Sequence, residues 1–89
     1  MSRILFAGSW WTTLGAAAAA YAATVLPEPA VIEPHEDADA VALDLIAYWT
    51  GEAQKIGEDV TPEGAEPAEW EEACHRAIVE RIAAWRAED

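Results

Sequence analysis

Between Ile4 and Leu26 the chain has 23 consecutive residues without a charged side chain. As one helix, a run of this length rises roughly 35 Å, more than the roughly 30 Å hydrocarbon core of a bilayer. Arg3 precedes the run, and a segment rich in carboxylates follows it. Because cations stay preferentially on the cytoplasmic side, this asymmetry predicts a membrane-spanning helix with its N-terminus in the cytoplasm.

Two other interpretations of the same run stay open. A short basic start, an apolar middle and the small-x-small sequence Ala20-Tyr21-Ala22 are typical of a secretory signal peptide. The run is also only moderately apolar, since five consecutive alanines, three threonines and two glycines add little insertion energy. It therefore also suits a core helix buried inside a soluble protein or a virus particle.

Small residues recur within this run at steps of three and four. On a helix such spacing leaves one smooth face, which allows a second helix to approach closely. An alanine-rich composition produces the same pattern by chance, and this is the plainer explanation. The predicted helix-packing face consists of Gly8, Thr12, Gly15, Ala16, Ala19, Ala20 and Ala23.

The charge of the chain lies almost wholly outside the uncharged run. Residues 28–89 hold all 17 Asp and Glu side chains, within a formal net charge of −12 for the chain. Such a surface repels nucleic acid and anionic lipid headgroups and favours basic protein surfaces. The cations in this part are Lys55, Arg76, Arg81 and Arg86.

The acidic part predicts two helices after a linker. Closely spaced prolines indicate an extended, polyproline-like linker over residues 27–36. Apolar residues then recur at helical spacing over residues 37–56 and again over 67–88. Each predicted helix has acidic residues near its start, which complements the helix dipole. A turn-rich segment separates them, so residues 37–89 should form an acidic helical hairpin.

The predicted fold is therefore all-α. It comprises an apolar transmembrane helix in residues 1–26, the linker and the acidic hairpin. The apolar faces of the hairpin supply a core of about a dozen side chains, which only roughly offsets the entropy lost on ordering about 50 residues. We expect the hairpin to need a partner for stability.

Five tryptophans are many for a chain of 89 residues. Tryptophan is enriched at interface hot spots and at membrane surfaces. The three that fall in the predicted hairpin have helical spacing, which favours a role in the core. The candidate partner or core aromatics are Trp10, Trp11, Trp49, Trp70 and Trp85.

Possible ligands for metals do not form a recognisable site in the sequence. The acidic run at residues 35–39 lacks the spaced loop and glycine of a calcium-binding hand, which favours a solvated helix cap. Cys74 and His75 are adjacent and point in different directions on a helix, and a zinc site needs two further ligands. As the single cysteine, Cys74 cannot form an intramolecular disulfide, and a packed residue is the expectation. We predict no metal and no cofactor.

The sequence also offers no nucleophile paired with a base and no Gly-rich phosphate loop, so an enzyme is disfavoured. The favoured function is a non-catalytic accessory or structural subunit of a larger membrane complex, with its acidic part on the outer or periplasmic side. The alternative is a soluble acidic helical binding protein. Such a protein would be a virion component or an inhibitor that presents carboxylates to a basic partner.

Overall fold

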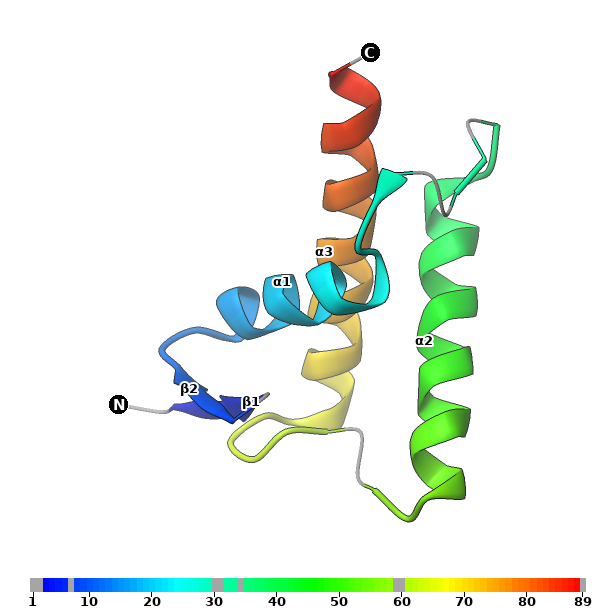
Figure 1. The fold of residues 1–89 in the computed structure, drawn as a ribbon. Helices are drawn as coiled ribbons and strands as arrows, with labels where there is room; N and C mark the ends of the chain where they lie inside the picture. The colour runs from blue at the N-terminus through cyan, green and yellow to red at the C-terminus, as the bar shows by residue number, and fades with distance from the viewer. Residues whose placement is uncertain (1–2, 7, 30–31, 34, 59–60, 89) are drawn as a thin grey trace.

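The computed structural model describes residues 3–6, 8–29, 32–33, 35–58 and 61–88. In these residues α1 crosses one face of α3, and α2 runs beside α3 in the opposite direction (Figure 1). A small antiparallel sheet lies next to the N-terminal end of α3 (Figure 1). The elements are β1 (Ile4–Phe6), β2 (Ser9–Trp11), α1 (Leu14–Val25), α2 (Ala38–Lys55) and α3 (Pro67–Ala87).

The uncharged segment forms a β-hairpin and then a short helix. In the hairpin, Ile4 lies opposite Trp11 and Phe6 lies opposite Ser9. Gly8 precedes β2 with φ of 78°. Glycine adopts this left-handed conformation without a steric penalty, so it suits the two-residue connection of a hairpin.

A helix N-cap separates the hairpin from α1. Thr13 is the N-cap of α1, and its side-chain oxygen accepts a hydrogen bond of 3.1 Å from the amide of Ala16. Capping of this kind satisfies a backbone donor that the first turn of a helix leaves unpaired. The helix therefore begins at Leu14, ten residues after the start of the uncharged run.

The prediction of a membrane-spanning helix over residues 4–26 is wrong. The 12 residues of α1 rise only about 18 Å. None of the helices found in the described residues has the length and hydropathy that a bilayer crossing requires. The predicted membrane location, with a cytoplasmic N-terminus, depended on that helix and is therefore not supported either. The all-α class is wrong as well, because β1 and β2 form a sheet.

The loop before α3 covers the other edge of β1. The amide of Leu5 donates a hydrogen bond of 3.0 Å to the carbonyl oxygen of Glu63, and these two residues form an isolated antiparallel bridge. Gly64 follows with φ of 94°, and a Cβ atom at this position would collide with the carbonyl oxygen of Arg3. The N-terminal strand and this loop therefore fit together only with glycine at position 64.

α3 is the central helix of the fold. Its buried side chains Trp70, Cys74, Ile78 and Ile82 recur every four residues, so they lie on one face. Two clusters of buried side chains form the core along this face. The first contains Ala22, Val25, Leu26, Ala42, Ile78 and Ile82, and the second contains Ile4, Ala17, Ala18, Trp70 and Cys74.

The linker after α1 folds back against α3. Among its described residues, the amide of Ile32 bonds to the carbonyl of Pro29 at 3.2 Å, and the amide of Glu36 bonds to that of Glu33 at 3.1 Å. Each of these bonds joins residues three apart, and the extended conformation predicted for residues 27–36 as a whole stays a prediction. Ala30, Val31 and Pro34 lie outside the described residues.

Two arginines of α3 hold this linker. Arg81 donates from Nε to the carbonyl oxygen of Leu26 at 2.8 Å, and Arg86 donates from Nη2 to the carbonyl oxygen of Glu36. The guanidinium of Arg81 also lies 4.8 Å from the ring centre of Trp85. Arg81 therefore satisfies a backbone carbonyl where α1 ends, and Arg86 satisfies one just before α2 begins.

The helical character predicted for the acidic part is confirmed. The observed α2 and α3 are each one or two residues shorter than the expected ranges 37–56 and 67–88. Asp37 caps α2, since its carboxylate accepts a hydrogen bond of 3.0 Å from the amide of Asp39. α2 packs loosely, because Ala42 alone among its described residues is buried.

Candidate functional site

The first half of α2 packs against α3, and a cleft opens beside its second half. Ala42 shares a buried cluster with Ile78 and Ile82 of α3. Farther along, α2 faces a cleft of about 1060 Å³. The opposite wall comes from β1, α1 and the first turns of α3. A cleft of this size between helices is a usual place for a ligand or a partner side chain.

Three aromatic rings form the floor of this cleft. Phe6 of β1, Tyr21 of α1 and Trp70 of α3 all line it. The ring centres of Phe6 and Trp70 lie 5.4 Å apart, and those of Tyr21 and Trp70 lie 5.9 Å apart in an edge-on arrangement. Such tilted contacts are the favourable geometry for aromatic pairs. The floor is thus built from three elements that are distant in sequence.

The titratable groups on the floor are held in their neutral forms. Burial raises the pKa of Tyr21 to about 12, and the nearby Cys74 adds to the shift. Burial likewise raises the pKa of the Cys74 thiol to about 12, with a further contribution from the negative charge of Glu71. A protonated thiol is a poor nucleophile and a poor metal ligand. The floor therefore offers apolar contact and no reactive group.

The α2 wall carries an apolar stripe, and its first member, Ile46, also packs against both core clusters. Ile46, Trp49 and Ala53 all line the cleft, and their spacing of three and four residues puts them on one side of the helix. Trp49 is 43% exposed, and its ring meets that of Tyr48 edge-on at 5.3 Å. Gly51 also lines the cleft, and a Cβ atom there would meet nothing within 4 Å.

The rim of the cleft is acidic. Its charged lining residues are Asp44, Glu58 and Glu71, and none of the described residues that line it is Lys or Arg. Three carboxylates around an apolar cleft attract positive charge. The candidate site thus combines apolar contact with a preference for basic ligands.

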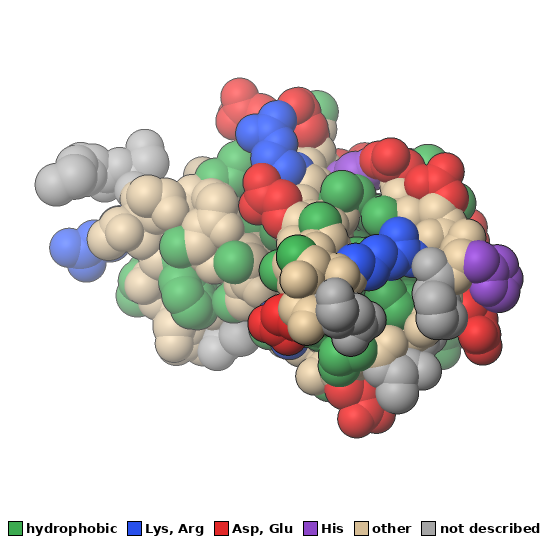
Figure 2. All heavy atoms as spheres, turned by 90° about the horizontal axis from the view of Figure 1, so that it is seen from above, with side chains coloured by type: hydrophobic (Ala, Val, Ile, Leu, Met, Phe, Trp, Pro, Cys, Tyr) green, Lys and Arg blue, Asp and Glu red, His purple; other side chains and the backbone are tan. Residues whose placement is uncertain are grey.

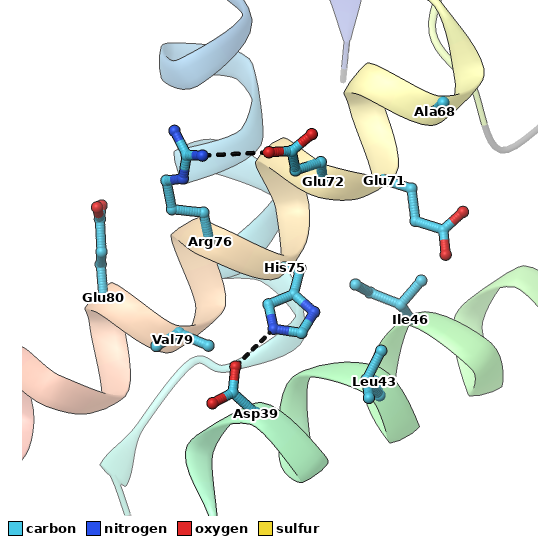
Figure 3. Close-up of a pocket in the computed structure, with 10 residues that line it drawn as sticks. All are labelled: Asp39, Leu43, Ile46, Ala68, Glu71, Glu72, His75, Arg76, Val79 and Glu80. Carbon is cyan, nitrogen blue, oxygen red and sulfur yellow. Dashed lines mark hydrogen bonds and ion pairs between the residues drawn. The ribbon is translucent and has the colours of Figure 1, made fainter.

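A second groove, of about 800 Å³, lies where α2 and α3 face each other. In Figure 3, His75 of α3 points toward Asp39 of α2, while Arg76 points toward Glu72 on its own helix. His75 Nε2 lies 2.8 Å from Asp39 Oδ1, and Arg76 Nη2 lies 3.2 Å from Glu72 Oε1. The His75–Asp39 contact links the first half of α2 to α3.

Acidic side chains are spread widely over the surface. Seen from the C-terminal end of α3, Asp and Glu side chains occupy several separate places around the molecule, with apolar side chains between them (Figure 2). On this face the negative charge is therefore spread over several places (Figure 2).

The structure separates the two N-terminal tryptophans. Trp10 lies on β2 and is 55% exposed. Trp11 is half-buried, and its indole N–H donates a hydrogen bond of 3.0 Å to the carbonyl of Phe6. Trp11 thus belongs to the hairpin, and Trp10 is left on the surface.

The other three tryptophans occupy different environments. Trp70 is buried, at 5% exposure, in the floor of the cleft, and Trp49 lies on the α2 wall. Trp85 is half-buried and packs on the core near the C-terminal end of α3. The cleft thus brings together two of the five candidate aromatics.

Most of the predicted helix-packing face is exposed. Gly8 and Thr12 precede α1, and both are exposed. On α1, Gly15, Ala19 and Ala23 are exposed, while Ala16 and Ala20 are partly buried. The buried alanines of α1 are Ala17, Ala18 and Ala22, which pack in the core with side chains of α3. They lie on a different face of α1 from most of the predicted positions. Packing of the predicted face on a partner helix stays a prediction.

The acidic run at residues 35–39 serves local structure. Asp37 caps α2, and Glu36 accepts a hydrogen bond of 2.9 Å from the amide of Glu33. In the part of the chain that the structure describes, no three His, Cys, Asp or Glu side chains are grouped so that they could hold a metal ion.

Sequence reasoning missed the floor of the cleft. Interpreting residues 4–26 as one helix placed Phe6 and Tyr21 fifteen residues apart on that helix, far beyond contact. The signal that could have found them is Gly8 between two short runs of apolar and aromatic residues, which is typical of a hairpin. The rim carboxylates could not be distinguished among seventeen.

No family model, no curated protein and no solved structure shows significant similarity to this chain.

Proposed function

We propose that this chain is a non-catalytic accessory subunit that binds a basic region of a partner protein in the cleft beside α2. The observation that carries the proposal is an apolar cleft of about 1060 Å³ whose charged lining residues are all carboxylates. Apolar contact gives affinity in such a site, and opposite charge sets the choice of partner.

The chemistry of the floor supports a binding role over a catalytic one. Burial raises the pKa of Cys74 to about 12, so its thiolate fraction at neutral pH is smaller still than that of an ordinary thiol. Tyr21 is held neutral for the same reason. The groups around the floor supply surface for contact and no activated nucleophile.

Site-specific photo-cross-linking in the source cells tests this proposal. A photoreactive amino acid replaces Ala47, which lines the cleft, or Ala40, an exposed residue near the start of α2 that does not line it. We expect position 47, and not position 40, to cross-link to one protein through a segment rich in Lys and Arg. Cross-linking of position 47 to no protein, or to an acidic segment, would contradict the proposed function.

A further inference from the structure

We infer that the cleft binds a single amphipathic helix of the partner, with apolar residues facing the floor and basic residues facing the rim. This inference rests on the proposed function and specifies the form of the partner. Recognition of this kind uses apolar anchors at positions i, i+3 or i+4, and i+7 of the bound helix.

The walls of the cleft favour a helix over an extended strand. A strand binds by adding to a free sheet edge, and β1 is the strand whose Phe6 lines the cleft. Both edges of β1 are used, since β2 pairs with one edge and Glu63 pairs with Leu5 on the other. The remaining walls are α1, α2, α3 and the loop residues Glu58 and Thr61, and helices pack against helices through side chains.

The spacing on α2 gives the dimensions of the bound helix. The cleft-lining part of α2 runs from Leu43 to Gln54, and this stretch of helix is about 18 Å long, or roughly three turns. Its apolar stripe continues the one that packs on α3 at Ala42. Gly51 has no side chain, so it lets another backbone come close. A partner helix would complete the packing that α3 provides only for the first half of α2.

Charge selects a basic partner over a second copy of this chain. Each copy carries a formal charge of −12, so two copies repel each other. The rim adds Asp44, Glu58 and Glu71 at the place where the bound helix would lie. Lys or Arg residues beside the apolar anchors would instead meet opposite charge.

Three synthetic peptides of about 14 residues test the inference by isothermal titration calorimetry with the full chain. The first has Leu at helical spacing with Lys on the opposite face. The second has the same composition in scrambled order, and the third has Glu in place of every Lys. Because the anchors need helical spacing, we expect the first to bind at least about tenfold more tightly than the second. The third should not bind.

Matched variants locate the binding. Trp49→Ala removes an exposed ring inside the cleft, and Trp10→Ala removes an exposed ring of the same type on β2. We expect Trp49→Ala to weaken binding of the first peptide at least about tenfold, as loss of an interface tryptophan commonly does. Trp10→Ala should change it less than about twofold. Circular-dichroism melting curves confirm that both variants fold.

A further pair fills space instead of removing it. Ala53→Gln adds bulk in the cleft, and Ala40→Gln makes the same change on an exposed position of α2 outside it. Only the former should weaken binding.

Distinct outcomes separate the inference from the proposed function. Equal binding of the ordered and scrambled basic peptides, with no effect of Trp49→Ala, would overturn the helix inference while the cross-linked partner still supported the function. Concentration-dependent dimers in sedimentation that Trp49→Ala abolishes would identify a second copy as the occupant, and would overturn the inference too. Failure of position 47 to cross-link any protein removes the function itself.

Discussion

At the scale of single residues, two glycines differ in what they do for the fold. Gly64 has φ of 94°, and a Cβ atom there would collide with the backbone of Arg3. Gly51 lies within α2, where a Cβ atom would meet nothing within 4 Å. The fold thus requires Gly64, whereas Gly51 destabilises α2 and leaves space at the wall of the cleft.

Replacing Gly64 with alanine should destabilise the protein strongly. The left-handed backbone alone costs a non-glycine residue about 1–3 kcal/mol, and the collision with Arg3 adds to that. Loss of the fit should also break the contact between Leu5 and Glu63. Urea unfolding followed by circular dichroism measures the change, and a free energy of unfolding within error of the wild type would contradict it.

Replacing Gly51 with alanine should have the opposite effect. Alanine is the better helix former, and the gain in an open helical position is about 0.5–1 kcal/mol. The same urea titration reports it as a higher midpoint with an unchanged slope. If the cleft admits a helix at close range, the added methyl group should also weaken binding of the ordered basic peptide, so stability and affinity change in opposite directions.

Tyr21 and Cys74 make stability depend on alkaline pH. Both have ordinary pKa values, 10.0 and 9.0, that the fold raises to about 12. The folded state therefore keeps protons that the unfolded state loses, and stability falls as pH rises. Their contribution is complete below about pH 9 and is lost progressively as pH approaches 12. Urea midpoints measured from pH 8 to 11.5 should decrease, and Tyr21→Phe should flatten the decrease above pH 10.

At the scale of elements, the junction between α1 and the linker depends on α3. The carbonyl of Leu26 lies at the end of α1, where Leu26 is 1% exposed. The guanidinium of Arg81 supplies its hydrogen bond and lies against Trp85. One side chain thus joins the end of α1 to the last turns of α3.

Arg81→Met tests this junction, because methionine keeps an apolar stem beside Trp85 and removes the donor. The buried carbonyl then lacks a charged partner, and we expect a loss of about 1–3 kcal/mol. Thermal unfolding by calorimetry checks it. Arg76→Met is the control, because Arg76 forms an exposed ion pair with Glu72 on its own helix, and exposed pairs contribute about 0–1 kcal/mol.

Local signals made some elements predictable and left others hidden. The acidic helices follow from apolar spacing, from Asp37 as a cap and from Pro67 in the first turn, all of which act within a few residues. The N-terminal segment depends on a partner that is distant in sequence, because Leu5 bonds to Glu63. The hydropathy of residues 4–26 indicates that they are buried, but it does not indicate whether lipid or protein buries them. The cleft depends on how far α2 packs along α3, which no local pattern encodes.

At the scale of the whole molecule, charge should act oppositely on stability and on binding. The chain has 17 carboxylates against five Lys and Arg residues. Self-repulsion of this kind opposes the compact state, and salt screens it. The attraction between the rim of the cleft and a basic partner is screened by the same ions.

Raising the NaCl concentration from about 0.05 to 0.5 M shortens the Debye length from about 14 to 4 Å. We expect the melting temperature of the free chain to rise, by about 4–8 °C for each kcal/mol gained. Affinity for the ordered basic peptide should fall over the same range. Differential scanning calorimetry and titration calorimetry at matched salt measure the two trends, and trends of the same sign would contradict this account of the charge.

The pairing of the N-terminal strand and α1 with α3 also has a consequence for synthesis on the ribosome. Ile4 and Leu26 are buried against Trp70, Cys74, Ile78 and Ile82, and these positions are translated later. At about 5–20 residues per second, roughly 3–11 s separate Leu26 from Ile82. During that interval the uncharged segment has been made but has nothing to cover it. Nascent-chain chaperones therefore have time to bind the uncharged segment before α3 is made.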